Sequence, residues 1–82
     1  MKAHVHVRLK PGILDPQGKA VQQALHHLGF RAVESVRIGK LIELEVAAET
    51  REEAEALVQQ ACQKLLANPV IETYDIEWVD AS

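Results

Sequence analysis

The sequence contains few residues of several kinds, and each shortage excludes a class of protein. A single cysteine, Cys62, excludes an intrachain disulfide framework and is expected to be a small buried residue. One Phe, one Tyr and one Trp are its aromatic residues, so the core has to be aliphatic. No apolar run approaches the roughly 20 residues that span a bilayer, and the first residues lack the apolar stretch of a signal peptide. These absences favour a soluble protein in a reducing, cytoplasmic setting.

The 82 residues favour one domain with a modest core, which self-association would extend. The net charge of −3 is unevenly placed: residues 1–40 hold seven Lys/Arg and two Asp/Glu, whereas residues 41–82 hold two and ten. One interpretation is a basic surface for an anionic partner. The other, which we favour, is that the two halves pack side by side and neutralise each other. The acidic total, without aromatic residues among the basic ones, argues against nucleic acid as a partner.

The first part of the chain predicts a strand, a tight turn and a helix. Residues 4–10 alternate between apolar and polar side chains, as a half-buried strand does. Residues 10–13, with proline second and glycine third, predict a type II turn. Asp15 suits the N-cap of a helix and Pro16 its first position, while Gly29 suits the C-terminal cap.

The second part predicts two strands, a helix and a last strand. Residues 32–38 and 41–46 are expected to be strands, with Gly39 and Lys40 between them as a type II′ hairpin turn. A capping box opens a helix over residues 50–68, which has a continuous apolar stripe. Residues 70–79 alternate again and predict the last strand.

The order β-α-β-β-α-β predicts an α+β ferredoxin-like sandwich, in which two helices cover one face of a four-stranded antiparallel sheet. In that topology the first strand lies centrally, between the third and the fourth. Its outward side chains would then stand beside the outward carboxylates of its neighbours, which is why we expect neutralisation. The two sets are His4, His6, Arg8 and Lys10, and Glu43, Glu45, Asp75 and Glu77.

The glycine-containing loop over residues 12–20, GILDPQGKA, does not have the pattern of a phosphate-binding loop. Five residues instead of four separate its glycines, and an alanine replaces the hydroxyl that would bind magnesium. Ile13 and Leu14 are apolar, and they either tuck over the helix layer or dock on another chain. Gly18 would allow another backbone to approach closely in either case.

The remaining reactive side chains form no catalytic constellation. His4 and His6 share one strand face and could chelate a metal, but no third ligand is evident at a suitable spacing. No base can be placed beside Cys62 from the sequence. We therefore expect no catalytic residue, no cofactor and no metal bound by this chain, and a binding, regulatory or assembly role.

Three blocks of the sequence follow one another in a recognisable order: LKPGILDPQGKAVQQAL followed by LGF, then VRIGKLIELEV, then LLANPVIE. Together they resemble the PurS family, the small subunit of phosphoribosylformylglycinamidine (FGAM) synthase. The resemblance covers essentially the whole chain, so it implies a single PurS-like domain over residues 1–82. It also implies a non-catalytic subunit of a glutamine-dependent, ATP-consuming C–N ligase of purine biosynthesis.

The resemblance further implies partners. In the family's complex a glutaminase subunit, PurQ, releases ammonia, and a synthetase subunit, PurL, uses ATP and magnesium to add it to formylglycinamide ribonucleotide. PurS, as a dimer or dimer of dimers, joins the two subunits so that the ammonia does not escape.

Two surfaces are candidates for these contacts. The first is a surface for the large subunit, with apolar anchors in its loop: Lys10, Pro11, Gly12, Ile13, Leu14, Asp15, Pro16, Gln17, Gly18 and Lys19. The second is the outer sheet face, expected to build the homo-oligomer through His4, His6, Glu43 and Glu45. The alternative function is a ferredoxin-like regulatory domain that binds a small molecule.

Overall fold

The structure, a computed structural model, describes residues 1–79. Its elements, in chain order, are β1 (Lys2–Leu9), α1 (Pro16–His27), β2 (Lys40–Glu45), α2 (Arg51–Ala61), the π-helical turn η1 (Cys62–Leu66) and β3 (Glu72–Val79). The strands form one antiparallel sheet in the order β2-β1-β3. The α+β class and the central position of the first strand are therefore confirmed. Among residues 1–79, no helix has the length and apolarity needed to cross a membrane.

The core lies between the sheet and α2. The alternation of β1 directs one set of its side chains to α2, and Ala3 and Val5 are fully buried there. From α2 and its continuation, Ala54, Val58 and Cys62 meet them, also fully buried. These side chains are small, which allows the helix to approach the sheet closely without aromatic residues.

The start of α2 follows the predicted capping chemistry. The Glu53 amide donates to Thr50 Oγ1 at 3.1 Å, which satisfies one of the helix's free N–H groups. At the same end, the guanidinium of Arg51 lies 4.9 Å from the ring centre of Trp78 on β3. The other end widens into η1, where the Ala67 amide donates to the Cys62 carbonyl at 3.0 Å. The cap stabilises the first turn of α2, and the cation–π contact joins that end of the helix to β3.

The predicted strand over residues 32–38 and the hairpin turn after it are wrong. Residues 33–39 are extended but pair with no strand, and the chain enters β2 at Lys40 without turning. Among residues 1–79, positive φ angles occur at Gly12 and Gly29 and not at Gly39. A Cβ at position 39 would lie 2.6 Å from the carbonyl oxygen of Val7. Glycine is needed there for close approach to β1, and the described sheet has three strands instead of four.

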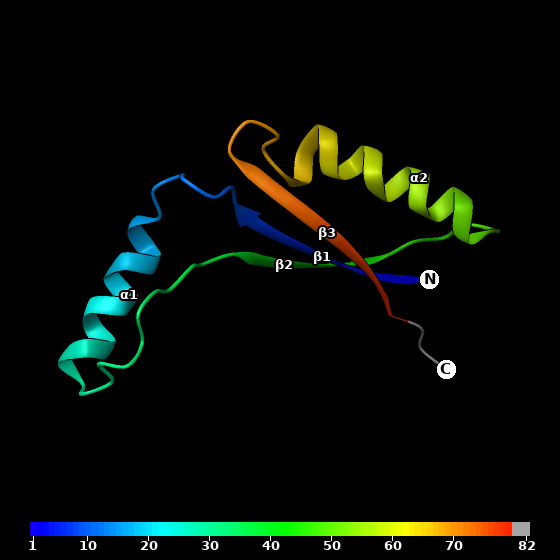
Figure 1. Cartoon of the computed structure of the whole chain (residues 1–82). Helices are drawn as coiled ribbons and strands as arrows, with labels where there is room; N and C mark the ends of the chain where they lie inside the picture. The colour runs from blue at the N-terminus through cyan, green and yellow to red at the C-terminus, as the bar shows by residue number, and fades with distance from the viewer. Residues whose placement is uncertain (80–82) are drawn as a thin grey trace.

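The expectation that two helices cover the sheet is also wrong, because α2 alone does so. Figure 1 shows α1 standing away from the sheet, with the extended segment before β2 running back beside it. We call residues 16–39, which comprise α1, the turn after it and this segment, the arm. The radius of gyration is 16.2 Å, whereas a compact chain of this length has about 12 Å. The arm therefore projects from a small sheet-and-helix body.

The arm is held together by contacts between α1 and the segment's backbone. Gln22 Nε2 donates to the Glu34 carbonyl at 2.5 Å, and a ring nitrogen of His26 lies 2.8 Å from the Val33 carbonyl. Near the start of α1, a Cβ at Gly18 would overlap the carbonyl oxygen of Val36. The close backbone approach expected at Gly18 is thus confirmed, and its partner is the segment that was predicted to be a strand.

Candidate partner-binding site

The first candidate surface begins with the turn that follows β1. The Ile13 amide donates to the Lys10 carbonyl at 3.1 Å, and Gly12 has φ 88°, as a type II turn requires. Lys10 ties the turn to the segment before β3: its amide donates to the Ile71 carbonyl and its Nζ to the Pro69 carbonyl, both at 2.8 Å. The loop therefore has a defined conformation.

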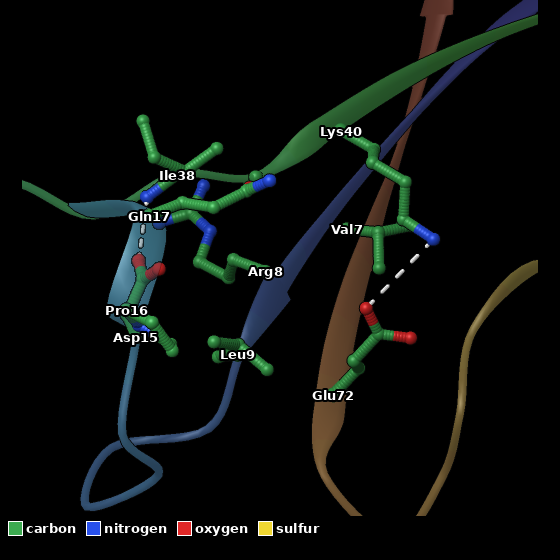
Figure 2. A pocket seen from close by; sticks show the side chains of 10 residues that line it. Val7, Arg8, Leu9, Asp15, Pro16, Gln17, Ile38, Lys40 and Glu72 are labelled. Atoms are coloured by element: carbon green, nitrogen blue, oxygen red, sulfur yellow. Dashed lines mark hydrogen bonds and ion pairs between the residues drawn. The ribbon is translucent and has the colours of Figure 1, made fainter. Parts of the chain in front are cut away.

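Asp15 connects this loop to the arm. Its Oδ1 accepts from the Gly18 amide at 2.9 Å, which caps α1 as predicted, and its Oδ2 accepts from the Ile38 amide at 2.8 Å (Figure 2). These hydrogen bonds, the Ile38 bond first, hold the pKa of Asp15 below its ordinary value of 3.8. One carboxylate thus joins the start of α1 to the end of the extended segment.

Arg37 adds a second connection between the arm and the body. Its Nη2 donates to the carbonyl oxygens of Leu9 and Lys10, each at 3.1 Å. The sequence analysis missed both Arg37 and Ile38 as members of this site. No local pattern could have indicated them, because their partners lie more than 20 positions earlier in the chain.

A hollow of about 290 Å³ lies where the arm meets the sheet, and charges of both signs line it (Figure 2). Asp15 and Glu72 supply carboxylates, while Arg8 and Lys40 supply cations. The Nζ of Lys40 lies 3.9 Å from Oε2 of Glu72, whose side chain is mostly buried. No hydroxyl, thiol or imidazole group lines this hollow. Its lining therefore combines charged groups of both signs with apolar side chains.

Beside it, a hollow of about 330 Å³ lies between the loop and the arm, and Ile13 and Leu14 contribute apolar walls. Ile13 is half-buried, whereas Leu14 is 77% exposed. Leu14 is therefore not tucked over a helix layer in this chain. A large apolar side chain on a rigid loop is well suited to contact with another protein.

The second candidate surface is the outer face of the sheet. His4 lies centrally, with its ring nitrogens 3.9 Å from a carboxylate oxygen of Glu43 on one side and of Glu77 on the other. His6 lies 3.2 Å from the same oxygen of Glu77, and Glu45 stands opposite Lys2. The predicted proximity of His4 and His6 to Glu43 and Glu77 is confirmed, whereas Lys10 donates to the Pro69 carbonyl instead of contacting one of these carboxylates. Among residues 1–79, no group of three or more His, Cys, Asp or Glu side chains is placed to hold a metal ion.

Cys62 is apart from both surfaces. Its side chain is fully buried beneath the sheet, as predicted, and burial raises the pKa of its thiol. A raised pKa and a buried position are the opposite of what a nucleophilic thiolate needs.

Fold and site together define a small α+β module with an anchored, partly exposed loop and an outer sheet face on which histidines lie beside carboxylates. Comparison with known proteins assigns it further. The family model described as PurS, phosphoribosylformylglycinamidine (FGAM) synthase, matches residues 2–80. The chain belongs to this PurS family.

The sequences and structures of individual relatives match this chain over nearly its full length. The FGAM synthase subunit PurS of Archaeoglobus fulgidus is 46% identical over 95% of this chain and 98% of its own. The solved PurS of Bacillus subtilis is 50% identical, with a TM-score of 0.83 over 93% of this chain and 94% of that chain. A chain in the structure of PurLQS from Thermotoga maritima is 36% identical, with a TM-score of 0.89 over 95% of each chain.

Proposed function

We propose that this chain is the non-catalytic assembly subunit of an FGAM synthase in purine biosynthesis. In this role it joins a PurL-type synthetase to a PurQ-type glutaminase, so that ammonia from glutamine reaches formylglycinamide ribonucleotide. The observation that carries the proposal is the similarity, over 95% of both chains, to a chain of the Thermotoga maritima PurLQS structure. ATP and magnesium act in the synthetase, this chain binds no cofactor, and the complex works in the cytoplasm.

Within this proposal, the loop over residues 10–19 contacts the synthetase. Three features support this assignment: the loop is anchored through Lys10, it is connected to the arm through Asp15, and it presents an exposed Leu14. A preorganised loop loses little conformational freedom when it binds, so more of its contact energy remains for the complex.

The test is to replace Leu14 by aspartate and to reconstitute the complex with the synthetase and glutaminase of the same organism. Because Leu14→Asp places a charge in an apolar contact, we expect at least a tenfold loss of glutamine-dependent synthesis and loss of the three-subunit species in native mass spectrometry. Ammonia-dependent synthesis by the synthetase should not change.

The matched control is Leu65→Asp, at an equally exposed leucine (83%) on η1, outside the loop. It should assemble and support synthesis like the unaltered chain. Normal assembly of the Leu14→Asp chain would contradict the contact assigned to the loop, and assembly of the other two subunits without this chain would contradict the function itself.

The outer sheet face is proposed as a contact between copies of the chain. His4 and His6 alternate with Glu43 and Glu45 across neighbouring strands, and such a mixed surface can form ion pairs with a second sheet. A His4→Glu, His6→Glu variant would place two new carboxylates beside those of Glu43, Glu45 and Glu77 and should reduce the mass of the assembly in solution. An unchanged mass would remove this face from the assembly. The four-stranded ferredoxin-like layout, too, is proposed for the assembled protein.

A further inference from the structure

A third hollow, of about 340 Å³, lies where the end of β1 meets the end of the arm. Its volume is within the range of sites that bind small molecules. The basic side chains in its lining are those of His6, Arg8, Arg37 and Lys40, and the lining contains no carboxylate. The hollow in Figure 2, in contrast, contains carboxylates as well as cations. We call the third one the basic hollow, because a concave site with positive charge of this kind attracts anions.

The alternation of extended backbone brings the two arginines of the basic hollow to one side. Arg8 follows His6 on the outer face of β1. The chain is also extended where the arm enters β2, so Arg37 and Leu41 lie on the same side as each other, two positions before and after Gly39. A Cβ at Gly39 would lie 3.6 Å from the Cβ of Arg8. Because glycine has no side chain, the space between Arg8 and Arg37 stays open.

No carboxylate neutralises Arg8 within residues 1–79. On β3 its cross-strand partner is Thr73, which has no charge, and on the other side it meets Gly39. Its guanidinium makes no hydrogen bond and no ion pair with any other residue of this part of the chain. Lys40 differs, because its ammonium is directed to Glu72 at 3.9 Å, as Figure 2 shows. Arg8 is therefore a cation that is available to a ligand.

Arg37 is positioned by bonds that leave its charge unbalanced. Only its Nη2 donates, and the acceptors are the uncharged carbonyl oxygens of Leu9 and Lys10. Asp15 is close enough for the charge of Arg37 to lower its pKa, but the backbone amides that it accepts come first, and it does not line the basic hollow. The bonds of Nη2 fix the plane of the guanidinium, while Nε and Nη1 remain free to donate to a ligand.

We propose that the basic hollow binds the phosphate group of a small phosphomonoester, held between Arg8 and Arg37. The planar fork of a guanidinium matches the oxygen atoms of a phosphate, and two such groups balance the charge of a phosphate dianion. Inorganic phosphate has the same chemistry, so the experiment compares the two. The site lies apart from the loop over residues 12–20, which does not have the pattern of a phosphate-binding loop.

Binding at this site has a structural consequence, because its two arginines belong to different parts of the chain. Arg8 ends β1 and belongs to the body, whereas Arg37 belongs to the arm. A phosphate that bonds to both adds a connection between body and arm, next to the bond from Asp15 to Ile38. A ligand that binds only the folded chain also stabilises it. The site adds to the proposed role in assembly and does not depend on it.

The experiment titrates ribose 5-phosphate, and separately inorganic phosphate, into the full-length chain at constant ionic strength, with calorimetric detection. We expect saturable binding and a melting temperature that rises with ligand concentration. Arg8→Gln should weaken binding by at least about tenfold, because it removes one charged donor pair. The melting temperature of this variant without ligand should equal that of the unaltered chain, since Arg8 has no partner to lose within residues 1–79. Absence of saturable binding, or unchanged binding by Arg8→Gln, would overturn the proposal.

Two controls make the result specific. Lys64→Gln removes one positive charge at an exposed position of η1, outside the hollow, and should bind ribose 5-phosphate like the unaltered chain. If it weakens binding as much as Arg8→Gln does, general charge attraction accounts for the binding and the proposed site is wrong. Ribose, which has no phosphate, should not bind.

The comparison of the two phosphates identifies the ligand. Tighter binding of ribose 5-phosphate supports a phosphomonoester, whereas equal or tighter binding of inorganic phosphate would overturn that part of the proposal. Complex formation with the synthetase and glutaminase is measured in parallel. If neither phosphate binds and the complex still forms, the phosphate site is wrong while the proposed function stands.

Discussion

At the scale of single residues, Gly18 shows that a glycine in a helix can be stabilising. Alanine in place of glycine ordinarily stabilises a helix by roughly 1 kcal/mol. Here a Cβ would overlap the Val36 carbonyl oxygen and lie 2.7 Å from Oδ2 of Asp15. We therefore expect Gly18→Ala to lower the free energy of unfolding by roughly 1–3 kcal/mol in urea denaturation.

The control for this prediction is Gln23→Ala, at an exposed position of the same helix, which should change the free energy by less than about 0.5 kcal/mol. A Gly18→Ala chain that is as stable as the control would show that the backbone contact is absent.

Asp15 predicts a pH dependence of stability. Its pKa is lowered in the folded chain, because the charged form accepts hydrogen bonds from Ile38 and Gly18. Its contribution is therefore fully present above the ordinary value of 3.8 and is lost as the pH falls from there through the lower folded value. Asp15→Asn keeps one acceptor oxygen for the helix cap and removes the second.

We expect the melting temperature of the Asp15→Asn chain to be lower than that of the unaltered chain near neutral pH. The two values should converge as the acid range below pH 3.8 is entered, in thermal scans by circular dichroism. A constant difference at every pH would mean that the carboxylate charge has no role in holding Ile38.

The residues of the candidate site differ in how far the sequence predicts them. The turn at residues 10–13 and the cap at Asp15 follow from residues within a few positions, where steric and hydrogen-bonding preferences act directly. The second bond of Asp15, to Ile38, joins positions 23 apart. Such a bond depends on the path of the arm, which no local preference determines.

At the scale of the elements, α2 supplies one side of the hydrophobic core of the body. Val58 is fully buried between this helix and the sheet. Val58→Ala removes apolar surface and leaves a cavity, so we expect a loss of about 2 kcal/mol in the free energy of unfolding. Gln59→Ala, one position further and exposed, is the control and should remain within about 0.5 kcal/mol. Equal effects of the two changes would contradict the packing of α2.

The elements that depend on local periodicity are those that the sequence predicts well. β1, β3 and both helices have an apolar set on one face, and each appears close to its expected range, although the last part of the second helix is the π-helical η1. Residues 32–38 also have strand-like composition, but a strand is assigned only when it pairs. Gly39 is compatible with a turn and with close approach to Val7, and the sequence does not distinguish the two.

At the scale of the whole molecule, association of copies would make stability depend on concentration. The arm exposes Val21, Leu28 and Phe30, and separation of copies that cover these side chains would expose them again, so unfolding and dissociation would be linked. We expect the melting temperature to fall by several degrees when the chain is diluted a hundredfold, as measured by thermal scanning. Melting that does not depend on concentration would contradict association through the arm.

The position of the sole tryptophan gives the molecule a built-in optical reporter. Trp78 lies on β3 with the Arg51 guanidinium over its ring, on the side of the sheet that α2 covers. Its emission therefore follows the docking of α2 and does not register the arm, which lies elsewhere in Figure 1. Ellipticity, in contrast, counts α1 and α2 together. If the arm unfolds before the body does, ellipticity will fall before the Trp78 emission changes. Fluorescence and circular dichroism of the unlabelled chain can therefore follow the two steps separately.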